Sequence, residues 1–259
     1  MFSKVLLIAL ASSPLVAAHG KLAVIQGDAG GNTTGLGIQG GVVPGAGPNS
    51  KTEVDTTIFN SIKAQSNGLG RTEGQGKNTV DMVSQAQDLS GSTLPQVSST
   101  NGSLSGTYHI VTTDGAGPVK AVLDTTGTGN FADGTLMDVT SQVPGTFGEI
   151  SPNGNAIRRA LVAMGVIAKR AANVNKDYPV AVAVPAGTTC TGTVNGMSNV
   201  CLAKIANSNP AGPFGGVVAF QMAGSSDTAA TTAAAAASTA SAVSAKADKA
   251  GKKAVKFAA

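Results

Sequence analysis

Short apolar runs bounded by turn residues recur through the middle of this 259-residue chain, and they constrain its fold more than any other feature. Such runs between Gly, Pro, Asn and Asp are typical of β-strands, because a helix needs a longer apolar stripe at a period of 3.6 residues. The composition agrees, with 34 Gly, no Trp and 12% charged residues. We predict strands at residues 22–25, 107–112, 119–123, 180–184 and 217–220.

One segment departs from this pattern. Residues 155–172 have apolar side chains at helical spacing and predict a helix. Residues 26–49 are too rich in Gly for a packed element and predict a long loop. We therefore expect a mainly β fold over residues 19–223, an immunoglobulin-like antiparallel β-sandwich with long Gly-rich loops and one inserted helix. A β-barrel has the same strand pattern and stays open as the alternative.

The two ends of the chain differ from this body. Residues 1–18 contain Lys4, a short apolar core and the small residues Val16-Ala17-Ala18, which is the pattern of a secretory signal peptide. The apolar core is shorter than the ~20 residues that span a bilayer, so we expect a secreted protein with no transmembrane segment. Residues 224–259 are rich in Ala, Ser, Thr and Lys and predict a disordered low-complexity tail.

The formal net charge of +4 belongs to these ends. Residues 19–223 carry equal numbers of basic and acidic residues, whereas the tail is rich in lysine. Because nucleic-acid binding needs a clustered basic face that displaces counterions from phosphates, we expect no nucleic-acid partner. Two roles stay open for the tail lysines: attachment to an anionic wall polymer or membrane, and solubility of the chain.

Export also bears on the two cysteines and on two sequons. Secreted proteins form disulfides, so we predict that Cys190 and Cys201 are joined and close a short loop rich in Gly and Asn. A zinc site is the weaker alternative, because the two thiols lack the paired spacing of zinc ligands. Asn32 and Asn101 each begin an Asn-x-Ser/Thr sequon and are candidate glycosylation sites.

The chain has only two histidines, and cleavage after Ala18 would place His19 at the new N-terminus. An N-terminal histidine offers its α-amine and its imidazole Nδ1, and a second histidine completes a T-shaped three-nitrogen site that suits copper. This arrangement is the histidine brace of lytic polysaccharide monooxygenases. We therefore predict one copper ion held by His19 and His109. The alternative is a flexible N-terminal residue at His19 and a structural strand histidine at His109.

A brace also needs a neighbouring polar group to tune the metal. Gln221, at the end of the last predicted strand, is our first candidate, because its amide can hydrogen-bond a bound oxygen species. Asp114, five residues after His109, is the second candidate, through its carboxylate. Tyr108 alternates to the other face of the strand that contains His109, and we expect it to be a core residue.

Other chemistries fit the sequence less well. No Gly-x-Ser-x-Gly elbow seats a nucleophile, and no Gly-x-Gly-x-x-Gly lies in a βαβ context that would cradle a phosphate. Glycoside hydrolysis by paired carboxylates stays open. Nothing in the sequence selects a pair among the acidic residues in or near Gly-rich turns, which are Asp28, Asp114, Asp124 and Glu149.

Four segments, in order along residues 19–221, resemble the Gas/Mas family of appressorium-associated secreted proteins of plant-pathogenic and other filamentous fungi. They are His19-Gly20 with Gly27-Asp28-Ala29-Gly30-Gly31 and Gly35-Leu36-Gly37, His109 with Asp114-Gly115-Ala116-Gly117-Pro118, Cys190-Thr191-Gly192-Thr193 with Asn199-Val200-Cys201, and Gly212-Pro213-Phe214-Gly215-Gly216 leading to Gln221. The resemblance implies expression around appressorium formation and host penetration, and a histidine start similar to that of copper monooxygenases. It also implies further half-cystines where this chain has Ala121, Ile205 and Val217, so the chain resembles a diverged member.

From these features we expect a secreted, monomeric penetration protein of a fungus. It would bind copper and oxidise a cell-wall polysaccharide, with chitin, cellulose and pectin all open as substrates. The alternative is a non-catalytic wall-associated or effector protein without redox activity, which the low aromatic content of 3% favours, because aromatic rings stack on sugars. Retention within the appressorium is the alternative to secretion.

Overall fold

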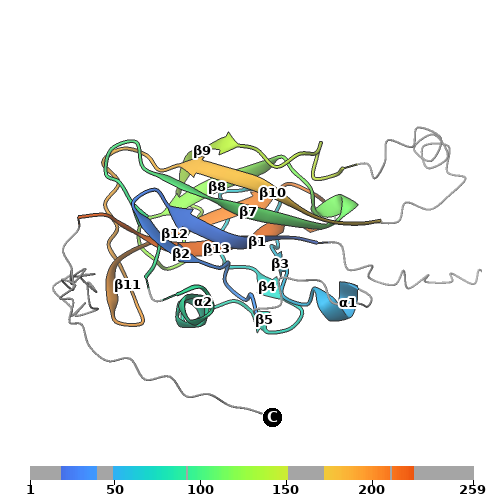
Figure 1. Ribbon diagram of the computed structural model, residues 1–259, viewed down its shortest axis with the longest axis horizontal. Helices are drawn as coiled ribbons and strands as arrows, with labels where there is room; N and C mark the ends of the chain where they lie inside the picture. The colour runs from blue at the N-terminus through green and yellow to red at the C-terminus, as the bar shows by residue number, and fades with distance from the viewer. Residues whose placement is uncertain (1–18, 40–48, 92, 151–171, 211, 225–259) are drawn as a thin grey trace, which may run out of the picture. The chain divides into compact units, whose positions relative to one another are not determined.

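The chain is mainly β in this computed structural model, which describes residues 19–39, 49–91, 93–150, 172–210 and 212–224 (Figure 1). The strands are β1 (Gly20–Gly27), β2 (Gly30–Thr33), β3 (Thr57–Ile58), β4 (Arg71–Thr72), β5 (Gly76–Lys77), β6 (Gln96–Val97), β7 (Ser103–Thr112), β8 (Val119–Asp124), β9 (Thr135–Ser141), β10 (Asn173–Ala183), β11 (Gly192–Val194), β12 (Met197–Asn207) and β13 (Phe214–Met222). The helical elements are α1 (Asn49–Thr52), α2 (Met82–Ser90) and the 3₁₀ turn η1 (Thr113–Gly115).

Seven strands close into a barrel. The ring runs β12-β8-β9-β10-β7-β1-β13, and it closes because β13 also pairs with β12. Every neighbouring pair is antiparallel except β1 and β13, which run parallel with Lys21 opposite Gly215. The prediction of a mainly β chain is confirmed, but the structure does not show an immunoglobulin-like sandwich. A sandwich keeps two separate sheets with edges, whereas the β1–β13 and β12–β13 pairings leave no edge within the ring.

The predicted elements lie as follows. Four of the five predicted runs fall within β1, β7, β8 and β13, and the fifth ends one residue beyond β10. Residues 26–49 are not wholly a loop, because β2 folds back on β1 within them. The predicted helix at residues 155–172 lies outside the described residues apart from its last one, and so do the predicted signal peptide and the tail from residue 225. Helix α2 and strands β9 and β12 had no counterpart among our predictions.

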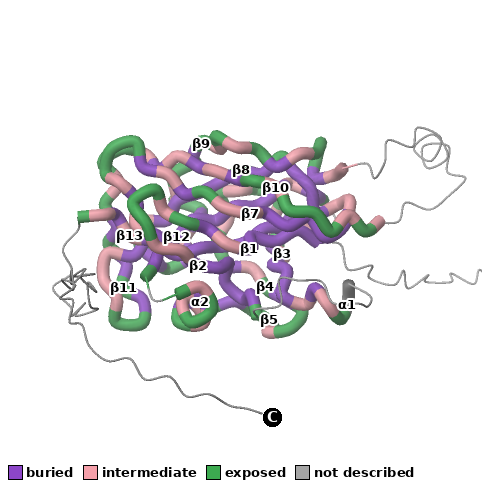
Figure 2. The backbone as a smooth tube through the Cα atoms, viewed as in Figure 1, coloured by how far each residue is buried: buried purple, intermediate pink, exposed green. Residues whose placement is uncertain are grey.

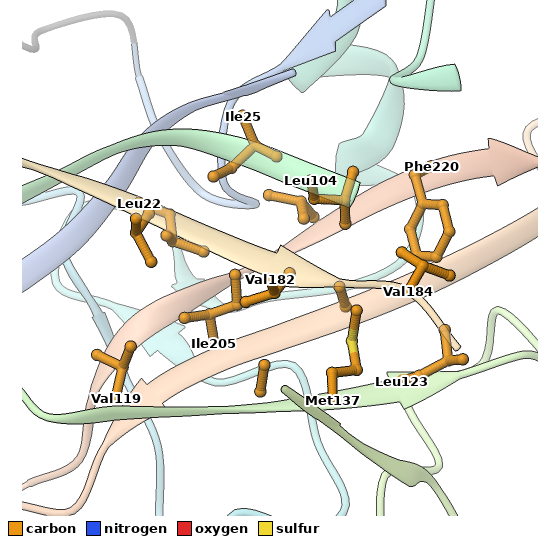
Figure 3. Packing of buried hydrophobic residues seen from close by; sticks show 14 of the residues in the cluster. Leu22, Ile25, Leu104, Val119, Leu123, Met137, Val182, Val184, Ile205 and Phe220 are labelled. Carbon is orange, nitrogen blue, oxygen red and sulfur yellow. The ribbon is translucent and has the colours of Figure 1, made fainter. Parts of the chain in front are cut away.

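Alternation along the strands divides the apolar side chains between two cores. The first core fills the barrel with residues from all seven strands, among them Leu22, Leu104, Val182, Ile205 and Phe220 (Figure 3). A bulge in β1 between Leu22 and Val24 lets both Leu22 and Ile25 point inward. Cys190 and Cys201 form the predicted disulfide within this core.

The second core lies on the outer face of β8, β12 and β13. Val122, Leu202 and Val217 point there, between neighbours that point into the barrel. Leu36, Phe59, Leu94 and Val83 of α2 cover them, and β12 and β13 are consequently buried along most of their length (Figure 2). Neither α1 nor α2 is long and apolar enough to cross a membrane.

Candidate functional site

The two histidines lie on the outer face of the β1–β7 pair. Lys21 is directly opposite His109 in the strand register and Gly20 is opposite Ile110, so His19 is the diagonal neighbour of His109. Diagonal neighbours have Cα atoms about 7–8 Å apart and present their side chains on the same face. That face is the outer one, because Leu22, Tyr108 and Ile110 belong to the core of the barrel. Both histidines are nevertheless buried, at 5% and 4% exposed.

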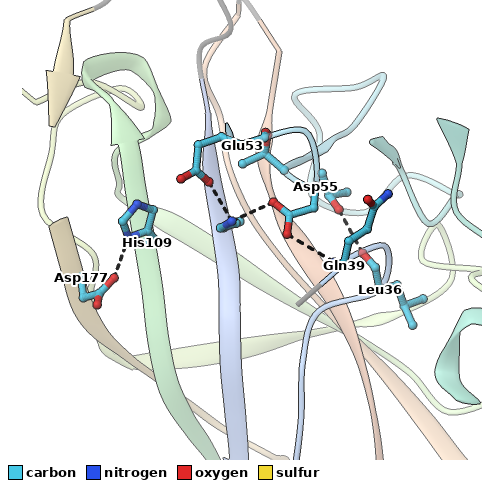
Figure 4. Close-up of polar contacts among 9 residues, drawn as sticks. Leu36, Gln39, Glu53, Asp55, His109 and Asp177 are labelled. Atoms are coloured by element: carbon cyan, nitrogen blue, oxygen red, sulfur yellow. Dashed lines mark hydrogen bonds and ion pairs between the residues drawn. The ribbon is translucent and has the colours of Figure 1, made fainter. Parts of the chain in front are cut away.

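The two ring nitrogens of His109 have different surroundings. Nδ1 lies 2.6 Å from Oδ1 of Asp177, which is opposite His109 on β10 (Figure 4). Nε2 is buried and has no hydrogen-bond partner. A buried polar atom without a hydrogen-bond partner costs about 1–3 kcal/mol, so its presence in a folded protein needs a specific reason. Binding of a metal ion by this nitrogen is one such reason. A metal-binding histidine has this arrangement, since its second nitrogen is held by a carboxylate.

The main chain of His19 is held from two sides by β7. Its nitrogen donates a hydrogen bond of 2.6 Å to Oγ1 of Thr112, whose hydroxyl in turn donates to Oδ1 of Asp114 at 2.8 Å. Its carbonyl oxygen accepts from the N–H groups of Val111 and Thr112. The imidazole lies 5.9 Å from the ring of Phe214, between centroids. Hydrogen bonds and packing therefore hold residue 19 in place, and the residue is buried rather than exposed.

Glycines allow η1 to pack directly on this residue. A Cβ atom at Gly20 would overlap the carbonyl oxygen of Gly115, and one at Gly115 would overlap the carbonyl oxygen of His19. The hydroxyl of Tyr108 lies 3.1 Å from the Gly115 carbonyl oxygen and 3.2 Å from that of Phe214. Tyr108 is fully buried in the core, as its alternation predicts, and burial raises its pKa above the usual value.

Asp114 is one of the two predicted tuning residues, and it lies beside His19. Burial raises the pKa of Asp114 above its usual value, and the charge of Glu149 raises it further. The hydrogen bond from Thr112 and the electrostatic interaction with His19 act in the opposite direction but do not cancel the effect of burial. Of the four acidic residues left open as a pair, the structure brings Asp114 and Glu149 within electrostatic reach of each other.

Gln221, our first candidate, is not brought to the histidines. Its Oε1 accepts a hydrogen bond from Nε2 of Gln96 at 3.0 Å, and its Nε2 donates to the carbonyl oxygen of Ser198 at 2.8 Å. The parallel pairing of β1 with β13 sets the beginning of β13, not its end, beside His19. Gln221 is seven residue steps along the strand from Phe214, which is roughly 23 Å. The structure thus places Asp114, and not Gln221, beside His19.

A buried charge cluster beside His109 was missed by sequence reasoning. Nζ of Lys21 lies 2.7 Å from Oε2 of Glu53 and 2.7 Å from Oδ1 of Asp55, and all three residues are at most 2% exposed (Figure 4). The backbone N–H of Gln39 donates to the other oxygen of Asp55 at 3.3 Å. Two carboxylates against one ammonium give the cluster a formal charge of −1. The lysine within the apolar run of β1 was the only signal, and nothing in the sequence marked its partners.

Two other acidic candidates hold turns together. Oδ1 of Asp28 accepts from the backbone N–H groups of Ser98 and Ser103. Asp124 accepts from the N–H groups of Thr126, Thr128 and Gly129. Of the two sequon residues, Asn101 is exposed in a turn and Asn32 is half-buried in β2.

The nitrogen atoms of His19 and His109 fit a histidine brace better than they fit a metal site made of side chains alone. Within the part of the chain that the structure describes, no three His, Cys, Asp or Glu side chains form a group that could hold a metal. A brace takes two imidazoles and the free α-amine of the first residue, so the absence of such a side-chain group does not address it. The unpartnered Nε2 of His109 is a donor of the required kind, and the nitrogen of His19 would be one as a free α-amine.

Comparison with known proteins shows that the chain is similar to fungal virulence factors. The family model described as Egh16-like virulence factor matches residues 17–215. The appressoria-specific virulence factor GAS1 of Pyricularia oryzae is 36% identical over 220 residues, which cover 85% of this chain and 78% of that protein. The appressoria-specific virulence factor GAS2 of the same fungus is 37% identical over 121 residues, which cover 46% of this chain and 35% of that protein. No solved structure matches the chain.

Proposed function

Because the chain belongs to the Egh16-like family of virulence factors, we propose that it is a secreted fungal protein of host penetration that binds one copper ion through His19 and His109. Homology to appressoria-specific virulence factors supports the role in fungal virulence. Copper binding, secretion and action on a wall polysaccharide are the finer parts of the proposal.

The observation that carries the copper proposal is the unpartnered Nε2 of His109. This nitrogen is buried on the same strand face as His19, while Asp177 holds the other ring nitrogen. A hydrogen bond to Nδ1 selects the tautomer whose Nε2 lone pair is available to a metal. With residue 19 at the N-terminus, His19 adds its α-amine and imidazole Nδ1, so that three nitrogens suit copper.

Copper, when bound there, supplies one-electron chemistry that can break a C–H bond beside a glycosidic link, with oxygen or peroxide and an external reductant. The chain's own residues orient and tune the site. Thr112 accepts a hydrogen bond from the nitrogen of His19, and Asp114 receives one from Thr112. The excess negative charge of Glu53 and Asp55 over Lys21 favours a cation on this face.

Electron paramagnetic resonance of Cu(II) tests the proposal. The protein is produced in a secretory host, and intact mass confirms that the mature chain begins at His19. We expect a stoichiometric axial signal with nitrogen couplings. An added Gly before His19, which removes the free α-amine, and His109→Ala should each abolish that signal. A mature chain that shows only free copper, or a signal unchanged in His109→Ala, would refute the brace.

A non-catalytic wall-associated or effector protein is the second candidate function. The 3% aromatic content favours it, because few rings are available to bind sugars. Incubation of the copper-loaded protein with chitin, cellulose or pectin and ascorbate separates the two functions. Oxidised oligosaccharides that disappear in His109→Ala support the enzyme, and tight copper binding without such products supports a binding role.

A further inference from the structure

Phe147 combines high exposure with an unfavourable backbone conformation. The residue is 80% exposed, and it is the only aromatic residue among the large hydrophobic residues exposed in the described part of the chain. Its φ of 52° lies in the left-handed region. A bulky aromatic residue there is a genuine outlier, because its Cβ crowds the backbone.

The outlier belongs to a tight two-residue hairpin. Thr146 and Glu149 exchange backbone hydrogen bonds of 2.8 and 3.0 Å, with Phe147 and Gly148 between them. Both central residues have positive φ, at 52° and 79°, as a type I′ turn requires. Asn-Gly is the usual pair in such a turn, so Phe147 occupies a position where Asn is preferred. Burial of the Phe147 ring does little to offset the strain of this conformation, which points to a role in binding rather than in folding.

This hairpin is bonded to the segment that packs on His19. The N–H of Gly148 donates to the carbonyl oxygen of Gly117 at 2.9 Å, and the N–H of Ile150 donates to that of Thr113 at 2.7 Å. Nδ2 of Asn209 bridges the carbonyl oxygens of Gly148 and Asp114, at 3.1 and 2.9 Å. Phe147 is therefore presented by a turn that is anchored to η1, the segment that packs on His19.

We propose that Phe147 is a glycan-binding residue whose exposed ring stacks on a sugar ring of a neutral wall polysaccharide and seats it beside the histidines. Aromatic faces pack against the apolar C–H face of a sugar and lose little conformational entropy in doing so. Asp114 and Glu149, close to each other and joined to the turn, are acceptors for sugar hydroxyl groups. The inference deepens the proposed function, since it names the substrate class of the same site.

Charge selects among the three polysaccharides that the sequence left open. The carboxylate of Glu149, which acts electrostatically on Asp114, repels the uronic acids of pectin, whereas chitin and cellulose are uncharged. The other exposed large hydrophobic residues, Ile62, Leu89 and Leu136, lie on separate elements and do not extend Phe147 into an apolar patch. A lone ring beside acidic groups suits a neutral sugar better than an anionic membrane, which would need basic neighbours.

Sedimentation with insoluble chitin or cellulose tests the inference on the full mature chain. We expect Phe147→Ala and Phe147→Asn to bind roughly tenfold more weakly than the wild type, and Phe147→Trp to retain binding. Phe147→Asn should also raise Tm by about 2–4 °C, because Asn tolerates the left-handed turn. Its loss of binding then cannot be attributed to unfolding. Leu136→Ala, which removes another exposed apolar side chain, is the matched control and should bind like the wild type.

Wild-type binding by Phe147→Asn and Phe147→Ala would overturn the inference, as would an equal loss in Leu136→Ala. Binding to polygalacturonate or to anionic vesicles in place of neutral glycans would also overturn it. The copper signal should be unchanged in every Phe147 variant. If that signal is absent from the wild type while binding still depends on Phe147, the copper proposal fails and the glycan inference stands.

Discussion

Asp177 and His109 face each other across β10 and β7, with Oδ1 of the aspartate 2.6 Å from Nδ1 of the imidazole. This contact decides which nitrogen of the ring is available, because it occupies Nδ1 and leaves the buried Nε2 without a partner. Asp177 itself is largely exposed, at 65% of its side chain. Solvent therefore competes for the carboxylate, while the imidazole is enclosed.

Replacement of Asp177 by Asn should weaken copper binding without unfolding the chain. The variant loses the carboxylate that orients His109, and loss of such a partner lowers metal affinity about 10–100-fold. Isothermal titration with Cu(II) measures the change. Asp138→Asn, an exposed aspartate on the neighbouring strand β9, is the control and should leave the affinity unchanged. Equal affinities in wild type and Asp177→Asn would show that Asp177 does not orient a ligand.

Thr112→Val and Asp114→Asn should lower copper affinity by a similar factor, because both interrupt the hydrogen bonds that lead from the nitrogen of His19 to Asp114. Asp114→Asn should not lower Tm, since burial already raises the pKa of this carboxyl and disfavours its charged form. Titration calorimetry and thermal unfolding of the same samples separate the two effects. A parallel loss of Tm and affinity in Asp114→Asn would indicate a structural role alone.

Lys21→Met should destabilise the protein by about 3–5 kcal/mol, because it leaves Glu53 and Asp55 buried without their cation. Urea unfolding followed by circular dichroism measures the free energy of unfolding. The triple variant with Glu53→Gln and Asp55→Asn should recover part of the loss. Lys120→Met, at an exposed position of β8, should change stability by no more than about 0.5 kcal/mol. A similar loss in both lysine variants would argue against the charge cluster as the cause.

The stability of the protein should rise between about pH 8 and pH 9.5 through Lys204. This residue is buried in the second core, where Nζ lies 4.7 Å from the ring centroid of Phe59 and donates to the carbonyl oxygen of Ser66 at 2.9 Å. Burial lowers its pKa to about 8. In the unfolded chain its pKa is about 10.4, so the unfolded state binds more protons above pH 8 and folding is favoured as the pH rises.

Urea unfolding at several pH values, from 7 to 9.5, tests this dependence. The rise should be about 2 kcal/mol in the wild type and absent in Lys204→Met. Lys120→Met keeps the buried lysine and should retain the full rise. An identical pH profile in wild type and Lys204→Met would mean that Lys204 keeps an ordinary pKa.

The strands could be predicted because their signal is local. Alternating apolar residues and Gly- or Asn-rich turns identified β1, β7, β8, β10 and β13, and two cysteines in a chain predicted to be exported have one possible bond between them. The helix α2 was missed because only Val83 and Ala86 of its nine residues are buried, which is too short a stripe to give a periodic signal. The barrel was not separated from a sandwich, since strand alternation is the same in both.

The candidate site, like the fold, could be predicted from the sequence only in part. The two histidines stood out in the sequence because no others exist in the chain, but their placement on one face depends on the register of β1 against β7. Gln221 was ranked first because the sequence shows where a strand ends and not where that end lies along its neighbours. Glu53 and Asp55 were missed because their partner Lys21 is more than thirty residues away.

The sequence by itself determined the strand-rich character of the chain, the pairing of its cysteines and the two histidines that we propose as copper ligands. These follow from residue counts and from side-chain periodicity, which act over a few residues. Only the tertiary structure decided that the strands close into a ring, that Asp114 rather than Gln221 lies beside His19, and that the turn of Phe147 is bonded to η1. The physical reason is that register and closure depend on hydrogen bonds and packing between segments far apart along the chain, whose combined free energy no local pattern records.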